Sequence, residues 1–227
     1  MKALENLFSL FYPNRCVLCG ETLAGQENFL CLSCRTGLPT TDQQPDTSNS
    51  LRERLHGKVA LDKTYAHLFY DKDGVGQRII SEIKYRGNIR FGVYMGQLLA
   101  NELVETGFFQ SVDYLIPVPL HPAKQRKRGF NQAEAIVRGI ASVVGIAQDK
   151  ASLIRLKSNE SQTAKGSYDR WLNTQGLFVI KDQKKFEGKH ILLVDDVITT
   201  GATINACMQP FLSIPGIRIS LLTLATT

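Results

Sequence analysis

Residues 188–203 read GKHILLVDDVITTGAT, a stretch that joins an apolar run to two acids and a turn rich in hydroxyls. Ile191 to Val194 form a short, continuous apolar run, which is typical of a strand buried on both faces of a parallel sheet. Asp195 and Asp196 follow directly, and open α/β sheets bind ligands beyond the carboxyl ends of their strands. The stretch therefore predicts a ligand site at one edge of a parallel sheet.

The turn after the two acids has the composition of an anion site. Residues 199–203 supply threonine hydroxyls, and Gly201 allows the backbone to approach a ligand closely. A helix is predicted from Ala202 to about Ser213, and its first amides and positive dipole end favour a phosphate. In this interpretation a phosphate monoester lies in the turn, while the acids face a polyhydroxyl group or its magnesium ion. The alternative is an ordinary strand followed by capping residues.

The composition is that of an ordinary soluble protein. The chain has 227 residues, 43% of them hydrophobic and 21% charged, which suits one α/β domain with a small appendage. Its apolar runs are far shorter than the roughly 20 residues that cross a bilayer, and residues 1–12 lack the cleavage site of a signal peptide. The net charge of +6 favours phosphorylated ligands or nucleic acid, although a basic charge alone is a weak indication. We therefore expect a cytoplasmic protein without a membrane span.

Four of the five cysteines form two CxxC pairs. Cys16 and Cys19 make the first pair, and Cys31 and Cys34 make the second. Without a secretory signal we expect a reducing compartment, in which paired thiols bind metal rather than form disulfides. The spacing predicts a tetrahedral structural zinc site; a redox CxxC is the alternative, but redox motifs come singly. The fifth cysteine, Cys207, is expected to be a small buried residue.

Apolar patterns predict alternating strands and helices in the larger, carboxyl-terminal part of the chain. Segments with strand composition are 64–70, 112–118, 153–156, 177–180, 191–194 and 217–224, and helical stripes cover 75–83 and 91–103. This alternation is typical of a twisted, mainly parallel α/β sheet flanked by helices. The polar composition of 40–50, with Pro45, is typical of a linker. We expect an N-terminal helix with a zinc-ribbon-like module in residues 1–39, a linker in 40–58 and the α/β domain in 59–227.

A basic segment follows the predicted strand 112–118. It places four positive charges within residues 124–128, where the carboxyl end of a strand meets a helix. This edge of the sheet also carries the acid pair, so a pyrophosphate group bound there would meet these charges. A solvated run of charge is the alternative. We predict that Arg126 and Arg128, together with His121, face such a group.

Residues 191–203 resemble the 5-phosphoribosyl-1-pyrophosphate (PRPP) motif of type I phosphoribosyltransferases, which is an apolar strand, two acids, two apolar residues and Thr-Thr-Gly-x-Thr. Further segments extend the likeness over nearly the whole chain. These are PVPLHP at 117–122, RGFNQ at 128–132, the polar stretch 155–173, KYRG at 84–87 and the amino-terminal cysteines. Together they resemble the ComF family of competence-associated phosphoribosyltransferase-like proteins.

This resemblance implies transfer of a phosphoribosyl group from PRPP to a nucleophilic acceptor, with release of pyrophosphate. Asp195 and Asp196 would hold the ribose and magnesium, and Arg126 and Arg128 would complete the catalytic set at the pyrophosphate. The implied PRPP-binding residues are Asp195, Asp196, Val197, Thr199, Thr200, Gly201, Ala202, Thr203, Leu120 and His121. The implied mobile loop carries Arg155, Lys157, Gln162 and Arg170. Residues 59–227 would be the phosphoribosyltransferase-like domain, and zinc would have a structural role.

Two other functions stay open at this point. A protein of this fold could bind PRPP as a signal without turning it over, or it could be a nucleic-acid-binding adaptor in DNA uptake. The adaptor would use the zinc module and the basic loops at 84–90 and 124–128. The expected partners are PRPP and an unidentified acceptor, with single-stranded nucleic acid or competence proteins. The acceptor itself is not named by any motif in the predicted hood, residues 59–92.

Overall fold

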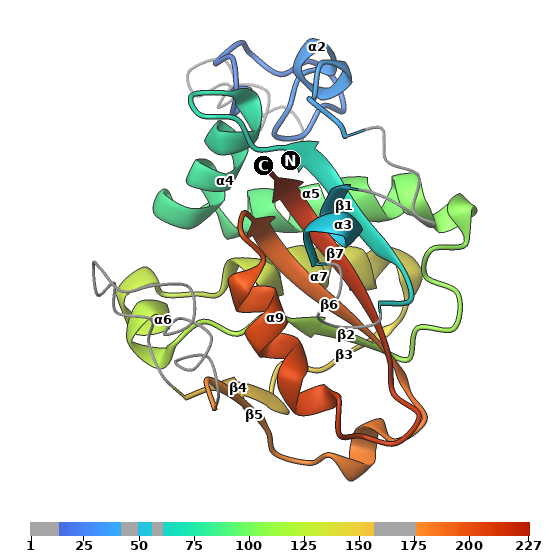
Figure 1. Cartoon of the computed structure of the whole chain (residues 1–227). Coiled ribbons are helices and arrows are strands. Elements are labelled where there is room, and N and C mark those ends of the chain that lie inside the picture. Colours follow the sequence, from blue (N-terminus) through green and yellow to red (C-terminus); the bar gives the residue numbers. More distant parts are fainter. Residues whose placement is uncertain (1–13, 42–49, 56–60, 157–175) are drawn as a thin grey trace, which may run out of the picture.

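A sheet of five parallel strands lies at the centre of the molecule, in the order β1-β7-β6-β2-β3 (Figure 1). The structure, a computed structural model, describes residues 14–41, 50–55, 61–156 and 176–227. The strands are β1 Thr64–Phe69, β2 Tyr114–Pro117, β3 Ala147–Gln148, β6 His190–Ile198 and β7 Arg218–Thr226. A separate antiparallel pair consists of β4 Leu153–Arg155 and β5 Phe178–Ile180. The predicted parallel α/β architecture is confirmed.

Helices cover both faces of the sheet. The longer ones are α4 Val75–Tyr85, α5 Ile89–Leu103, α6 Pro122–Arg128, α7 Gln132–Val144 and α9 Ala202–Met208; α2 Leu32–Thr36 and α3 Ser50–Leu55 are short. Single 3-10 turns occur at Val104–Thr106, Lys184–Phe186 and Gln209–Phe211. Helices α5 and α7 lie on one face and α3 and α9 on the other (Figure 1). None of the helices in the described ranges is long and apolar enough to span a membrane.

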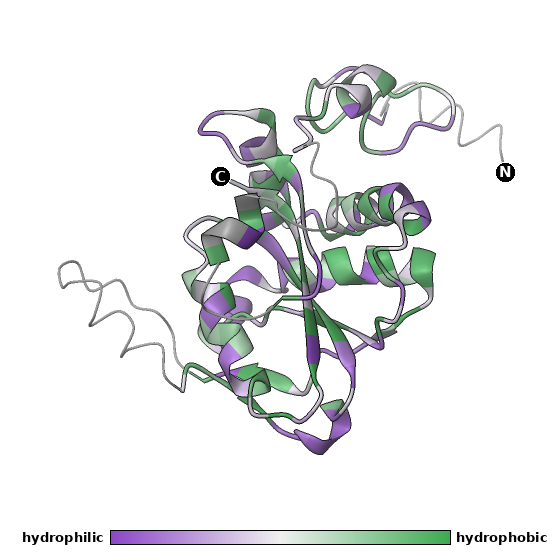
Figure 2. Cartoon of the chain, turned by 45° about the vertical axis from the view of Figure 1, so that its right-hand side comes forward, coloured by the Kyte–Doolittle hydropathy of each residue, from purple (hydrophilic) through white to green (hydrophobic). Residues whose placement is uncertain are grey.

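The alternation of side chains along β6 divides the core in two. Leu192 and Val194 point into the core that contains α5 and α7, whereas Ile191 and Leu193 point into the core that contains α3 and α9. All four side chains are fully buried, as expected for successive residues of a strand with a packed layer on each face. Hydrophobic stretches accordingly run along the central strands and the helices beside them (Figure 2).

Strand β6 is longer than the predicted run 191–194, since it continues through both acids to Ile198. Its extension is held by β7, where Asp195 pairs with Thr223 and Val197 with Ala225. The helix predicted from Ala202 starts there but ends at Met208, and a 3-10 turn that contains Pro210 follows. Proline has no amide hydrogen to continue the helical ladder, which accounts for the early end.

The predicted linker, residues 40–58, differs from its expected character in the part that the structure describes. Helix α3 falls within it, and its Leu51 and Leu55 are fully buried against the sheet core. Thr41 also docks on β1, because its amide donates to the carbonyl of His67 and its hydroxyl donates to that of Ala66. Two leucines spaced four residues apart are enough to bury one face of this short helix.

The cysteine module packs directly on the α/β body. Leu30 and Leu38 belong to the same hydrophobic core as Ile79 and Phe91, which lie on α4 and α5. In Figure 1 the module, in blue, lies above α4. The described residues of the module and the body therefore share one core.

Candidate functional site

A cavity of about 230 Å³ opens at the carboxyl edge of β2 and β6. It is lined by Lys84, Tyr85, Val118, Pro119, Leu120, Lys124, Arg128, Asn131, Gln132, Arg155, Asp195, Asp196, Val197 and Thr203. These residues come from the ends of two strands and from α4, α6, α7, α9 and β4. The cavity therefore lies where open parallel sheets bind their ligands.

The acid pair lies on one side of this cavity. Oδ1 of Asp195 accepts a hydrogen bond from the amide of Asp196 at 2.9 Å, and Oδ1 of Asp196 accepts one from the amide of Val197 at 2.8 Å. Oδ2 of Asp196 forms an ion pair with Nζ of Lys84 at 2.8 Å. Burial raises the pKa of Asp195 well above its ordinary value, and the negative charge of Asp196 raises it further. Asp195 therefore retains its proton more readily than an ordinary aspartate.

Helix α6 presents one basic face to the cavity and another to solvent. Lys124 and Arg128 lie one turn apart on the same side of α6, and both line the cavity. Arg126 lies two positions from each of them, which turns its side chain to the opposite side of the helix, and it is not part of the lining. His121 is also outside the lining; its Nδ1 accepts a hydrogen bond from the amide of Ala123 and caps the helix. Of the predicted pyrophosphate groups, the structure brings only Arg128 to the cavity.

Two polar residues at the start of α7 form the floor of the cavity. Asn131 caps the helix through Oδ1, which accepts from the amide of Ala133, and its Nδ2 donates to the carbonyl of Val118. Gln132 follows with only 2% of its surface exposed. Its Nε2 has no hydrogen-bond partner among the described residues. Gln132 thus lines the cavity and carries a buried donor that no described residue satisfies.

The threonine-rich turn lies only partly on the cavity. Thr203 and Val197 belong to the lining, whereas Thr199, Thr200, Gly201 and Ala202 do not. Gly201 has a φ of +72°, and an added Cβ would come within 2.5 Å of Cδ2 of Leu55. The left-handed backbone therefore favours glycine at this position, and a larger residue would also displace the end of the Leu55 side chain.

Arg155 is the described member of the predicted mobile loop. It is 7% exposed, lines the cavity and lies with its guanidinium carbon 5.3 Å from the centre of the Phe178 ring. Burial lowers the pKa of this guanidinium from its ordinary value, but arginine still keeps its charge at neutral pH. Lys157, Gln162 and Arg170 lie outside the described residues.

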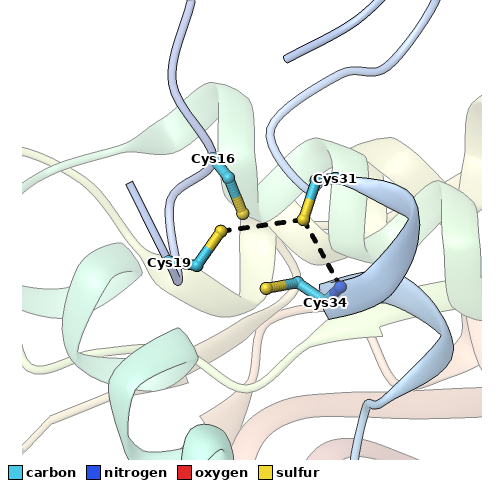
Figure 3. A group of neighbouring side chains, drawn as sticks. All are labelled: Cys16, Cys19, Cys31 and Cys34. Carbon is cyan, nitrogen blue, oxygen red and sulfur yellow. Dashed lines mark hydrogen bonds between the residues drawn. The ribbon is translucent and has the colours of Figure 1, made fainter. Parts of the chain in front are cut away.

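The four amino-terminal cysteines converge on one point (Figure 3). Their sulfur atoms all lie within 4.8 Å of one another, and Sγ of Cys19 lies 3.7 Å from Sγ of Cys31. Burial opposes ionisation of Cys16, but hydrogen bonds from the amides of Cys19 and Cys31 outweigh it and lower the pKa of Cys16 to about 6. Four converging sulfurs fit a tetrahedral zinc ion. Cys207, by contrast, is fully buried in the core, as predicted.

Lys124 was counted among the four positive charges of residues 124–128 but not among the predicted site residues, and Lys84 and Gln132 were not assigned to the site. Lys84 and Gln132 lie in segments that carry the family resemblance, so these segments were found and the individual side chains were not. Their selection depends on which face of a helix points inward. Tyr85 is a further lining residue, with 77% of its surface exposed and the guanidinium carbon of Arg128 5.7 Å from its ring centre.

Comparison with known proteins gives consistent matches. Residues 90–225 match the family model of the phosphoribosyl transferase domain. Competence protein F of Haemophilus influenzae is 35% identical over 206 residues, which cover 86% of this chain and 89% of the relative. Competence protein ComFC of Streptococcus pneumoniae is 26% identical over 216 residues, 84% of this chain and 90% of the relative. DNA utilization protein YhgH of Salmonella typhimurium is 27% identical over 135 residues, so this match spans only 58% of that relative's length.

The family match includes the features on which the cavity depends. Residues 90–225 contain β2, β6, the acid pair, α6 and α7, and the longer match to competence protein F extends over most of the chain. The chain therefore belongs to the phosphoribosyl transferase domain family, in the group of competence protein F, as the ComF resemblance predicted.

Proposed function

We propose that this protein binds PRPP in the cavity and transfers its phosphoribosyl group to a nucleophilic acceptor, with release of pyrophosphate. The observation that carries the proposal is the arrangement of charge across the cavity. The acid pair comes from the end of β6, and Lys124 and Arg128 come from α6, so acidic and basic groups from different elements line the same cavity. A ligand with hydroxyls at one end and an anionic leaving group at the other suits this arrangement.

Each part of PRPP has a partner in this proposal. Asp195 and Asp196 hold the ribose hydroxyls, and the turn 199–203 holds the 5-phosphate with its amides and hydroxyls. Lys124 and Arg128 hold the pyrophosphate. The anomeric carbon becomes cationic as pyrophosphate leaves, so carboxylates near the ribose and cations at the leaving group stabilise the transition state.

Two metal ions belong to the proposal. Magnesium accompanies PRPP and is coordinated by its pyrophosphate oxygens, since hard cations prefer oxygen ligands. Zinc is held by Cys16, Cys19, Cys31 and Cys34, which fit it in number, identity and spacing. Zinc at a closed site of four sulfurs stabilises the fold and takes no part in transfer.

Calorimetric titration with PRPP and magnesium tests the assignment. The double substitution Asp195→Asn and Asp196→Asn should lower the affinity at least about tenfold, because hydrogen bonds to charged groups are worth roughly 1.5–3 kcal/mol. A matched control is Asp71→Asn with Asp73→Asn, which changes two exposed acids of the turn before α4. Thermal unfolding checks that each protein is folded. A double variant that binds PRPP as tightly as the parent excludes this site.

A second candidate function is the binding of single-stranded nucleic acid, with a role in DNA uptake alongside competence proteins. The exposed ring of Tyr85, with Arg128 beside it, offers a stacking surface at the rim of the cavity. The names of two relatives, competence protein F and DNA utilization protein YhgH, support the same function.

The same titrations distinguish the candidates. An oligonucleotide that binds here should be displaced by PRPP and should bind more weakly as salt rises, because phosphate contacts release counterions. Loss of labelled PRPP with candidate acceptors identifies the transferase. PRPP that binds but is never consumed identifies a sensor, and an oligonucleotide that binds together with PRPP lies outside the cavity.

A further inference from the structure

Lys84 forms an ion pair with the acid pair from a different element of the fold. It lies in the last turn of α4, and its Nζ is 2.8 Å from Oδ2 of Asp196 on β6. Only 18% of the Lys84 side chain and 10% of the Asp196 side chain are exposed. A pair removed from water to this degree is stronger than the exposed pairs whose contribution is close to zero.

Both carboxylate oxygens of Asp196 already have a partner in the free protein. Oδ1 accepts a hydrogen bond from the amide of Val197, and Oδ2 lies 2.8 Å from Nζ of Lys84 in an ion pair. Among the described residues, the other charged groups on the cavity wall, apart from Asp195, are Lys124, Arg128 and Arg155, all of them cationic. A divalent ion approaching the pair would therefore meet repulsion from several directions.

The ammonium of Lys84 offsets the negative charge of the acid pair, since its Nζ lies 2.8 Å from Oδ2 of Asp196. Magnesium is held in proteins by ionised carboxylates and water in a near-ideal octahedron. In the free protein the acid pair does not fit this requirement.

We propose that Lys84 is the built-in counter-ion of the acid pair and takes the place at Asp196 that a divalent cation would otherwise occupy. The pair then selects ligands that donate hydroxyl hydrogens, and a metal ion enters the cavity only with the ligand. When hydroxyls of a bound sugar donate to Asp196, the ammonium is free to turn towards a phosphate oxygen in the same cavity. The sugar and phosphate rest on the proposed function, whereas the exclusion of metal does not.

Titration with Mn²⁺ alone, followed by the loss of its free-ion electron paramagnetic resonance signal, tests the inference on zinc-loaded protein without PRPP. The substitution Lys84→Met keeps the length of the side chain and removes its charge. It should create a site at least about tenfold tighter for Mn²⁺ than any in the parent, because a neighbouring charge has been removed from a partly buried site. Adding Asp196→Asn to Lys84→Met should abolish the gain, and Lys84→Arg should bind Mn²⁺ as weakly as the parent.

Arg86→Met is the matched control for charge. Arg86 lies two residues further along, its side chain is 78% exposed and it pairs with Glu82 rather than with the acid pair. The inference is overturned if Lys84→Met binds Mn²⁺ no more tightly than Arg86→Met. It is also overturned if the parent binds Mn²⁺ without PRPP at a site that Asp196→Asn removes. Lys84→Gln provides the same measurement if Lys84→Met does not fold.

The two proposals fail in different ways. If Mn²⁺ binding rises in Lys84→Met but no protein binds PRPP, the counter-ion role stands and the phosphoribosyl assignment falls. If the parent binds PRPP through the acid pair and Lys84→Met gains no Mn²⁺ site, the assignment stands and the counter-ion role falls.

Discussion

Gln132 is buried at the floor of the cavity and has an amide nitrogen without a partner among the described residues. An unsatisfied buried donor costs free energy in the unliganded protein. If a phosphate oxygen of a bound ligand accepts a hydrogen bond from this nitrogen, binding removes that free-energy cost and thereby increases the affinity.

We expect Gln132→Leu to separate binding from stability. The leucine should lower PRPP affinity about tenfold or more, since a hydrogen bond to a charged group is lost, while resistance to urea should be equal or higher. Calorimetry and urea unfolding measure the two effects, with Gln125→Leu on the exposed side of α6 as the control. Unchanged PRPP affinity would show that Gln132 does not contact the ligand.

At the scale of single residues, the sequence predicted those site residues that their immediate neighbours in the sequence identify. The acids follow an apolar run and the cysteines occur in pairs, so adjacent positions are enough to find them. The choice between Arg126 and Lys124 depends instead on the rotation of α6, and both are equally basic in the sequence. Only the packed position of the helix determines that Lys124 and Arg128 share the inner face.

The turn that connects β3 to β4 is held by one buried acid, Asp149. Its Oδ1 accepts from the amides of Ala151 and Ser152, and its Oδ2 accepts from the Ser152 hydroxyl and the Lys185 ammonium. Burial alone would raise the pKa of Asp149, but these hydrogen bonds, with that from Lys185 the largest, lower it to about 2. The β4–β5 pair that presents Arg155 to the cavity begins directly after this turn.

Asp149→Asn should therefore destabilise the protein at neutral pH by about 2 kcal/mol. The folded-state pKa lies below that of the unfolded chain, so this contribution is complete above the ordinary value of 3.8 and is lost as pH falls towards about 2. Urea unfolding at pH 7 and pH 3 should show the difference between parent and variant shrinking in acid. The exposed acid Asp71 provides the control Asp71→Asn, and an equal difference at both pH values would contradict the argument.

The long helical stripes and the short apolar strands β4 and β5 were predicted, whereas β3 and α3 were not. The stripes at 75–83 and 91–103 correspond to α4 and α5, since helices of that length display their buried face clearly. Strand β3 has two exposed residues and no pattern to detect. Helix α3 was hidden in a polar segment, because two buried leucines are all that it contributes to the core.

The cysteine module and the body form one core, so loss of zinc should affect the whole molecule. Cys34→Ser should remove stoichiometric zinc and lower the melting temperature by several degrees in a single transition, because Cys16 and Leu30 pack with Ile79 of α4. Elemental analysis and calorimetry measure the two effects. Ser33→Ala, at an exposed position between two ligands, should keep both zinc and stability.

A separate transition for the module, with the main transition unchanged, would instead support the independent linker-joined module that the sequence suggested. The prediction of an independent module was based on the polar composition of residues 40–50. The core that Leu30 and Leu38 share with residues of α4 and α5 is a tertiary feature that no local sequence pattern predicts.

The order of strands also determines when this sheet can form. Strand β1 lies beside β7, where Thr64 pairs with Leu221 and Phe69 with Thr226, although more than half of the chain separates them in sequence. On the ribosome, β1 is therefore synthesised long before its neighbour in the sheet exists. Until β7 has emerged, the backbone of β1 lacks the strand with which it pairs. Closure of the sheet thus waits for β7, and β1 is a segment that a chaperone would have reason to hold in the meantime.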